Sequence, residues 1–460
     1  MQFKINGRTI EAMGVKSDSR KVQPGDIFIA YKGVLVDGHD YIPQAIKAGA
    51  VAVVCERTVR VKAYPPIVIV VSDGRETWAD LCAQQYNYPQ KDLKFVGITG
   101  TDGKTTTSTF IYEVLKKAGY RVGLISTVSA KYNNKDISTG LHTTSPDPDQ
   151  LFKLLKEMVD DEVEYVVLEV TSHALVQERY YGIHFEACAV TNVTSEHLDL
   201  HNTYSQLIKD KARLFEMSDA IFVNPDAQGI QEILKYVPEK IIQNKKLFKI
   251  YSKEIQNELM SKNFLRKFPG EYNVQNASLA FEIAKYLGVN SQKAIDAILQ
   301  TNPLKGRFQY IPNDKDLNII VDFAHTENSM RNVLTAVKNM KKDNEKLITV
   351  FGCAGERDKQ KRPKMGKVAS ELSDIVIVTS EDPRSEDTHI IVNEIVAGNN
   401  KFDFTKEVDR RKAIEKAIKL ANKGDWILIL GKGHEESMNI NGIEVPWSDE
   451  KETRECLASM

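Results

Sequence analysis

Short runs of apolar residues alternate with amphipathic stretches along most of the chain. In the C-terminal part the apolar runs occupy residues 318–323, 347–351, 375–379 and 426–430, and helical patterns such as 329–340 separate them. Strands that alternate with helices in this way predict an α/β fold with an open parallel sheet. Ligands of such sheets bind beyond the carboxyl ends of the strands. We therefore expect the functional residues in the polar segments that follow each run.

One of these segments lies between an apolar run, 94–98, and an amphipathic helix that we expect to end at Gly119. The segment and the first turn of the helix consist of Gly100, Thr101, Asp102, Gly103, Lys104, Thr105 and Thr106. Strand, glycine loop, Lys-Thr and helix are typical of a phosphate-binding loop, because its backbone N–H groups and the helix N-terminus favour phosphate oxygens. Lys104 would neutralise the β- and γ-phosphates of ATP, and Thr105 would bind Mg²⁺. The alternative is a glycine turn that binds nothing, since Ile98 stands where the strict motif has its first glycine.

Two polar residues downstream are candidates for a metal site. Glu169 is the one carboxylate in the apolar run 165–170, where a bare charge is costly unless it is paired or bound to a metal. His197 follows the next apolar run, 188–193. Both side chains are expected near the phosphate loop. The alternative for each is a hydrogen-bonded polar group of the core.

A lysine falls on the apolar face of the helix that we expect to begin near Thr203. Helical spacing places Lys211 with the apolar residues of this helix, whereas Lys209 and Arg213 point elsewhere. Burial lowers the pKa of a lysine and makes its neutral amine more available. The alternative is a side chain that extends to the surface.

Composition and charge narrow the function classes. The chain has 460 residues and a formal net charge of -1, so bulk nucleic-acid binding and a nucleic-acid motor are disfavoured. Its five cysteines show no metal-ligand or redox spacing. No signal peptide and no membrane span are expected, which favours the cytoplasm. Polar breaks near 87–92 and 301–306 divide the chain into three expected domains, 1–92, 93–304 and 305–460.

Several motifs together resemble the Mur ligase family, and most of all its branch that adds the third residue of the peptidoglycan stem peptide. They are GTDGKTTT from Gly100, LHTTSPDPD from Leu141, LEVTSHALVQER from Leu168, GERDKQKRPKMG from Gly355, EDPRSED from Glu381 and GKGHE from Gly431. The resemblance implies an N-terminal UDP-sugar-binding domain, a central ATP-binding domain and a C-terminal Rossmann-like domain that binds an amino acid. We expect a monomer whose partners are small molecules: ATP, UDP-MurNAc-L-Ala-D-Glu and a diamino acid.

The implied reaction is the ATP-dependent addition of a diamino acid to UDP-MurNAc-L-Ala-D-Glu through an acyl phosphate. Meso-diaminopimelate is favoured, because Arg384 offers a bidentate partner for its distant carboxylate. L-Lysine stays open, because Asp382 stands where the family has Asn and would suit an ammonium group or pair with Arg384.

The resemblance also implies residue roles. For ATP it adds to the loop the residues Asn273, Asn276, Arg307, Asp322 and His325. For the UDP-MurNAc-dipeptide it implies Ser19, Thr143, Thr144, Thr171, Gln177 and Arg179. For the amino acid it implies Arg357, Asp382, Arg384, Gly431 and Glu435. The catalytic residues would be Lys104, His197 and Lys211, and the Mg²⁺ ligands Thr105, Glu169, His197 and Lys211.

Lys211 aligns with the family lysine that CO₂ carbamylates, which turns a cation into an oxygen-rich anion suited to Mg²⁺. The chain departs from the family at Glu327, where proline is usual, and at Ala354 and Glu356, where Gly and Asp are usual. Two alternatives remain. One is a sibling ligase of the D-Ala-D-Ala-adding or folylpolyglutamate type, and the other is an inactive nucleotide-binding regulatory protein.

Overall fold

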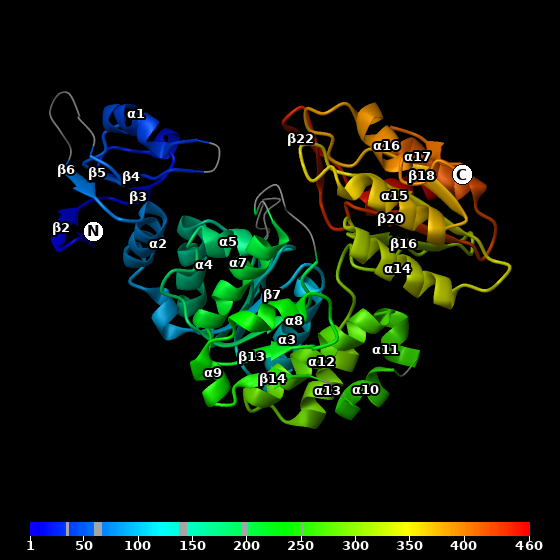
Figure 1. Cartoon of the computed structure of the whole chain (residues 1–460), viewed down its shortest axis with the longest axis horizontal. Coiled ribbons are helices and arrows are strands. Elements are labelled where there is room, and N and C mark those ends of the chain that lie inside the picture. The colour runs from blue at the N-terminus through cyan, green and yellow to red at the C-terminus, as the bar shows by residue number, and fades with distance from the viewer. Residues whose placement is uncertain are drawn as a thin grey trace.

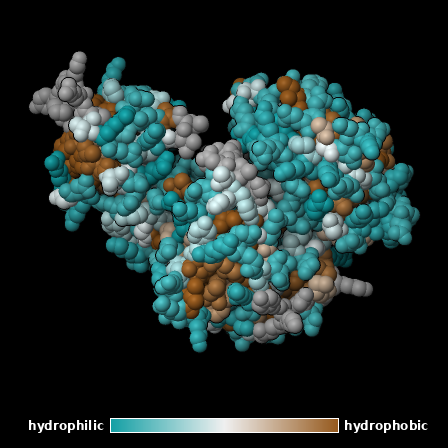
Figure 2. All heavy atoms as spheres, viewed as in Figure 1, coloured by the Kyte–Doolittle hydropathy of each residue, from teal (hydrophilic) through white to brown (hydrophobic). Residues whose placement is uncertain are grey.

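The computed structural model describes residues 1–33, 36–58, 67–137, 145–194, 201, 203–250, 253–260 and 262–460. Figure 1 shows three bodies, in which the N-terminal and C-terminal parts lie apart on either side of the central part. The two outer bodies face each other across a hollow in the surface (Figure 2). In the part of the chain that is described, no helix combines the length and the apolar character that crossing a membrane requires.

The N-terminal body contains a small parallel sheet in the order β3-β4-β5-β6, and an antiparallel hairpin, β1-β2, precedes it. The strands are β1 (Gln2–Ile5), β2 (Arg8–Glu11), β3 (Val15–Lys16), β4 (Ile27–Ala30), β5 (Ala52–Cys55) and β6 (Ile67–Val70). The helices are α1 (Ile42–Lys47) and α2 (Gly74–Gln85), with 3-10 turns at Ser19–Lys21 and Gly38–Tyr41. Apolar residues of α2 share one core with those of α4 (Pro148–Asp160), so this body packs directly on the central one.

The central body is built on an eight-stranded sheet in the order β10-β9-β8-β11-β7-β12-β13-β14. The strands are β7 (Lys94–Thr99), β8 (Val122–Ile125), β9 (Ala130–Tyr132), β10 (Lys135–Ile137), β11 (Tyr165–Glu169), β12 (Phe185–Val190), β13 (Ile221–Val223) and β14 (Leu247–Lys249). The helices besides α4 are α3 (Lys104–Ala118), α5 (Ser172–Val176), α7 (Tyr204–Glu216), α8 (Ile230–Ile233), α9 (Glu239–Gln243), α10 (Lys253–Leu259), α11 (Lys262–Lys267), α12 (Glu271–Tyr286) and α13 (Ser291–Gln300). Separate apolar cores cover the two faces of the sheet, which explains why its strands are continuous apolar runs.

The C-terminal body contains a six-stranded sheet in the order β15-β16-β20-β17-β18-β19, which is parallel apart from β15. Its strands are β15 (Gln309–Tyr310), β16 (Asn318–Asp322), β17 (Leu347–Phe351), β18 (Ile375–Val378), β19 (Thr405–Lys406) and β20 (Trp426–Leu430), and β21 (Ser437–Ile440) and β22 (Ile443–Pro446) form a hairpin. The helices are α14 (Glu327–Met340), α15 (Lys361–Leu372), α16 (Thr388–Val396), α17 (Arg410–Leu420) and α18 (Asp449–Ala458). The predicted α/β class and parallel sheets are confirmed, and the residue boundaries at 92 and 304 stay predictions.

Candidate functional site

The phosphate loop joins β7 to α3, as the sequence predicts. Gly100 and Gly103 have φ values of 142° and 83°, which L side chains rarely adopt. A Cβ atom on Gly103 would lie 2.6 Å from Asn276 Oδ1, so the loop packs closely against α12. Lys104 Nζ donates to the carbonyl oxygens of Gly100 and Thr101 at 3.0 and 2.8 Å. Lys104 is therefore held against the loop whose bound phosphates it would neutralise.

Glu169 ends strand β11 directly beside this loop. It is 1 % exposed, and it pairs in register with Ile98 of β7. Its Oε2 accepts hydrogen bonds from Thr105 Oγ1 at 3.2 Å and from Thr127 Oγ1 at 2.8 Å. Thr127 was not among the predicted residues, although it follows β8 at the strand-end position that the sheet rule favours. Mg²⁺ prefers oxygen ligands such as carboxylates and hydroxyls. The side chains of Glu169, Thr105 and Thr127 therefore fit this metal.

Lys211 is buried, as the helical spacing predicts. It is 2 % exposed, whereas Lys209 and Arg213 of the same helix are exposed. Its Nζ donates to Gly100 O at 3.0 Å, which brings α7 to the phosphate loop. The predicted ligand His197 lies outside the described residues. Within those residues no three His, Cys, Asp or Glu side chains form a metal-holding group.

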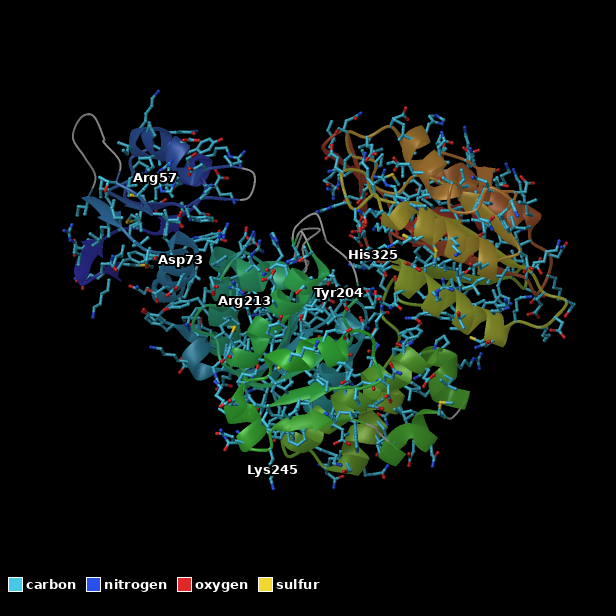
Figure 3. The ribbon with its side chains drawn as sticks, in the orientation of Figure 1. Arg57, Asp73, Tyr204, Arg213, Lys245 and His325 are labelled. Atoms are coloured by element: carbon cyan, nitrogen blue, oxygen red, sulfur yellow. The ribbon has the colours of Figure 1, made fainter. Side chains whose placement is uncertain are left out.

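A cavity of about 690 Å³ lies between the central and C-terminal bodies. The phosphate loop lines it together with the predicted ATP residues Asn273, Asn276, Arg307, Asp322 and His325. Its size is in the range of small-molecule sites. Figure 3 places His325 at the side of the C-terminal body that faces the central one. The structure thus brings the predicted ATP residues from both bodies to one cavity.

Two groups on the C-terminal side of this cavity have shifted pKa values. Burial raises the pKa of Asp322, whose oxygens accept from the backbone N–H groups of Phe308 and Ala324 at 2.6 and 2.8 Å. Burial and the charge of Arg307 lower the pKa of His434 to about 3, so that this ring is neutral near pH 7. Arg307 itself donates to Thr105 Oγ1 at 3.2 Å. A cation of the C-terminal body therefore reaches a hydroxyl at the phosphate loop.

The residues predicted to hold the dipeptide gather at α5. Thr171 is the N-cap of this helix, and its Oγ1 accepts from the backbone N–H of Ala174. Arg179 donates to Gln177 Oε1 at 2.7 Å and forms an ion pair with Asp147 at 3.0 Å. Thr143 and Thr144 lie outside the described residues. Ser19 is in the N-terminal body, where its Oγ donates to Gln44 Oε1 at 3.0 Å.

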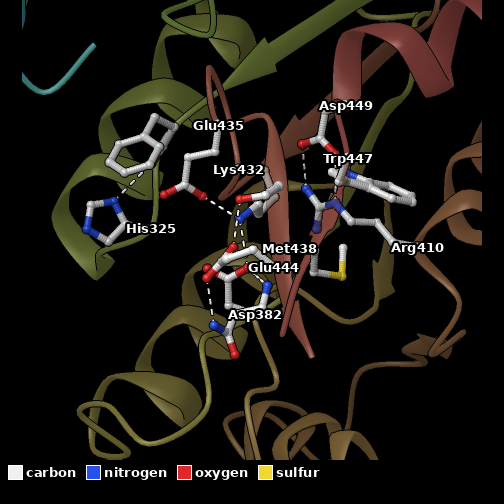
Figure 4. Close-up of polar contacts among 12 residues, drawn as sticks. His325, Asp382, Arg410, Lys432, Glu435, Met438, Glu444, Trp447 and Asp449 are labelled. Atoms are coloured by element: carbon white, nitrogen blue, oxygen red, sulfur yellow. Dashed lines mark hydrogen bonds and ion pairs between the residues drawn. The ribbon is translucent and has the colours of Figure 1, made fainter. Parts of the chain in front are cut away.

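Residues predicted for the amino acid surround a buried lysine that the sequence reasoning did not single out. Lys432 Nζ forms ion pairs with Asp382 Oδ1 at 2.7 Å and with Glu435 Oε2 at 2.5 Å (Figure 4). Of the two alternatives predicted for Asp382, pairing with Arg384 is wrong, because Asp382 lies against Lys432 instead. The guanidinium of Arg384 makes no hydrogen bond or ion pair with the described residues. Two carboxylates, Asp382 and Glu435, therefore share the one ammonium group of Lys432.

A second buried cation connects the two motifs of this region. Arg362 of α15 donates to Glu386 and Glu394 at 2.8 and 2.6 Å, and to the carbonyl oxygen of Ala354 at 3.1 Å. The hydrogen bonds from Arg362 hold the pKa of Glu386 well below its usual range. The segment with Arg357, which is exposed, is thus fixed to the segment with Arg384.

Comparisons with known proteins agree with this geometry. Three family models match the chain: "Mur ligase family, catalytic domain" at residues 11–86, "Mur ligase middle domain" at 98–284 and "Mur ligase, glutamate ligase domain" at 306–433. Proteins of Clostridium perfringens (strain 13 / Type A) and Bacteroides thetaiotaomicron are 38% and 37% identical to it, over 92% and 97% of this chain and 90% and 96% of theirs. Both are named UDP-N-acetylmuramoyl-L-alanyl-D-glutamate--2,6-diaminopimelate ligase.

A solved structure with the same name matches the fold with a TM-score of 0.62 and 27% identity, covering 99% of this chain and 98% of that one. A folylpolyglutamate synthase from Mycobacterium tuberculosis, solved in complex with ADP, has a TM-score of 0.64 at 16% identity and covers 78% of this chain and 92% of its own. At that identity the second likeness concerns the fold alone.

Proposed function

Because the chain belongs to the Mur ligase family, we propose that it is an ATP-dependent ligase that joins meso-diaminopimelate to UDP-MurNAc-L-Ala-D-Glu. The observation that carries this proposal is the cavity between the two bodies. The phosphate loop lines it on the central side, and Arg307 and His434 line it on the C-terminal side. The names of the relatives support the choice of substrates.

The reaction proceeds in two steps. The terminal carboxylate of the D-glutamyl residue attacks the γ-phosphorus of ATP, which releases ADP and forms an acyl phosphate. The amino group of diaminopimelate then attacks the acyl carbon, phosphate leaves, and the amine loses a proton. Neither step needs a covalent bond to the protein, so positioning and charge stabilisation dominate.

The residues near the loop are suited to the first step. Lys104 would move from the loop carbonyls to the β- and γ-phosphates, and Arg307 would add a second cation from the C-terminal body. Mg²⁺, held by Thr105, Glu169, His197 and carbamylated Lys211, would offset the charge on the phosphoryl oxygens. Lys211 fits this role because it is buried and already contacts the loop at Gly100. Carbamylation forms an N–C bond between Nζ and CO₂ and releases one proton.

The charges in the C-terminal body support diaminopimelate over lysine. Its second carboxylate requires a cation, and the guanidinium of Arg384 is not engaged by the described residues. The side-chain ammonium of a lysine substrate would instead require an anion. Asp382 and Glu435 share Lys432, which reduces their attraction for a further ammonium group.

The test is phosphate release by the purified chain with ATP, Mg²⁺ and UDP-MurNAc-L-Ala-D-Glu, supplied in parallel with meso-diaminopimelate, L-lysine or no amino acid. We expect stimulation by meso-diaminopimelate. Stimulation by lysine alone would overturn the choice of acceptor. Equal rates in all three arms would overturn the proposed reaction.

A further inference from the structure

The phosphate loop carries an acidic residue, Asp102, at a place where a negative charge is unfavourable. A carboxylate a few ångströms from a triphosphate is repelled by it, most strongly where water is excluded. We therefore expect the side chain of Asp102 to have a role other than phosphate binding. Its side chain has one: Oδ2 accepts a hydrogen bond from Asn328 Nδ2 at 2.7 Å, and Oδ1 accepts from Thr326 Oγ1 at 3.4 Å.

Both donors belong to the C-terminal body. Thr326 is the N-cap of α14, where it forms a capping box with Ser329, and Asn328 lies in the first turn of that helix. The contacts therefore connect residues separated by 224 and 226 positions in the chain. A helix N-terminus favours a carboxylate, because its unpaired N–H groups and its dipole are positive at that end. The loop carboxylate thus has a favourable partner outside the loop.

The central side of this contact is rigid. The backbone N–H of Asp102 donates to Asn192 Oδ1 at 3.0 Å, and its carbonyl oxygen accepts from Thr191 Oγ1 at 2.6 Å. Because β12 ends just before these two residues, the sheet itself fixes the position of Asp102. On the other side, the capping box fixes the start of α14. The hydrogen bond between Asp102 and Asn328 therefore joins two rigid elements.

We propose that Asp102 and Asn328 form an interdomain latch that positions the C-terminal body over the phosphate loop for amide formation. The inference rests on the proposed function, since it is the incoming amine of that reaction that the C-terminal body would deliver. Both are positioning residues, because their side chains hold the C-terminal body in place. The phosphates would be bound by the rest of the loop that contains Asp102. Arg307, which contacts Thr105, lies at the same junction.

A swap of the two side chains tests the latch. In Asn328→Asp two carboxylates oppose each other, whereas Asp102→Asn combined with Asn328→Asp restores one donor and one acceptor in reversed order. We expect Asn328→Asp to lower kcat for phosphate release with meso-diaminopimelate about tenfold, and the double variant to recover most of the loss, as for directly coupled pairs. The dissociation constant of an ATP analogue should change much less than kcat.

The matched control is Asn332→Asp, which adds the same charge one turn further along α14. Adding Asp102→Asn is not expected to rescue that variant. A rescue there, or an impaired Asn328→Asp that the double variant fails to rescue, would overturn the latch. Wild-type kinetics in Asn328→Asp would overturn it as well.

A readout without catalysis separates this proposal from the proposed function. Small-angle scattering of the ligand-free protein should give a larger radius of gyration for Asn328→Asp than for the wild type, and the double variant should return to the wild-type value. If the wild type shows no acceptor-dependent turnover, the proposed reaction fails, and scattering alone then decides the latch. An unchanged radius in Asn328→Asp would count against it.

Discussion

Glu381 is a buried carboxyl group beside the predicted amino-acid site. Its Oε2 has no hydrogen-bond partner among the described residues, and a Cβ atom on Gly431 would lie 2.8 Å from it. Burial raises the pKa of Glu381 to about 7, against opposing effects of Lys361, Lys432 and Arg410. The folded protein therefore holds a proton that the unfolded chain releases near pH 4.5. Stability is consequently lost as the pH rises from that value toward 7.

We expect Glu381→Gln to remove this dependence. The variant should gain about 1–3 kcal/mol in the free energy of unfolding at pH 8, the penalty typical of a buried polar group without a partner, and gain little at pH 4. Urea unfolding at the two pH values measures the difference. Glu386→Gln is the matched control, and it should lower the free energy of unfolding at pH 8. The reason is that Arg362 lowers the pKa of Glu386 and stabilises its charged form. An equal gain at both pH values would contradict the assignment for Glu381.

Lys211 offers the sharpest residue-scale test of the proposed carbamate. Lys211→Ala should reduce ligation by about a hundredfold or more, because the proposed Mg²⁺ site loses one of its ligands and the metal offsets the charge on the phosphoryl group. Short carboxylic acids such as formate or acetate should restore part of the rate. Lys209→Ala, an exposed lysine of the same helix, is the control and should retain activity. Normal turnover in Lys211→Ala would refute the carbamate.

At the scale of elements, the apolar runs predicted most of the sheets. The run 426–430 coincides with β20, and the helix start at Thr203 and the helix end at Gly119 are confirmed as caps. The run 188–193 is placed three residues too far along the chain, since β12 is Phe185–Val190. Thr191 and Asn192 follow the end of this strand, and their side chains hydrogen-bond the backbone of Asp102.

The partners of polar groups could not be predicted in the same way. Periodicity gives the face on which Lys211 lies, because the repeat of a helix is local. The pairing of Lys432 with Asp382 connects residues 50 positions apart and depends on how two strand ends meet. The contact of Asp102 with Asn328 depends on the arrangement of two bodies. Neither of these two contacts produces a periodic pattern in the sequence, so neither could be predicted from it.

Helices α17 and α18 are joined by a buried ion pair that also supports the predicted amino-acid loops. Arg410 donates to both carboxylate oxygens of Asp449 at 2.7 Å, and to the carbonyl oxygens of Ser380 and Leu430 at 3.0 and 2.9 Å (Figure 4). Those carbonyls directly precede Glu381 and Gly431. The pair therefore fixes the two segments that carry Asp382 and Glu435.

We expect Asp449→Ala to cost about 3–5 kcal/mol of stability, because it leaves a buried guanidinium without its carboxylate. In variant protein that remains folded, the KM for meso-diaminopimelate should rise more than the KM for ATP. Urea unfolding and steady-state kinetics measure the two effects. Glu455→Gln breaks an exposed contact with Arg411 between the same helices, and it should change neither quantity measurably. Equal effects of the two variants would show that burial of the pair is unimportant.

At the scale of the whole molecule, the proposed substrate sites lie on separate bodies. Ser19 belongs to the N-terminal body and Arg384 to the C-terminal one, and these bodies stand apart across the hollow in Figure 2. An acyl phosphate hydrolyses in water, so the reaction requires the bodies to approach and exclude solvent. The segment around 301–306, which carries Gly306 at a φ of 66°, is the expected hinge on the C-terminal side.

The radius of gyration should therefore decrease when the UDP-MurNAc-dipeptide, a non-hydrolysable ATP analogue and meso-diaminopimelate are all present. The ATP analogue alone should cause a smaller change, because it contacts the central body and one outer body but leaves the N-terminal body without a ligand. Small-angle scattering of the wild type measures both states, and calorimetry under the same conditions verifies that the ligands are bound. Saturated sites with an unchanged radius would mean that the reacting groups meet without closure, and the hinge near 301–306 would then have no part in catalysis.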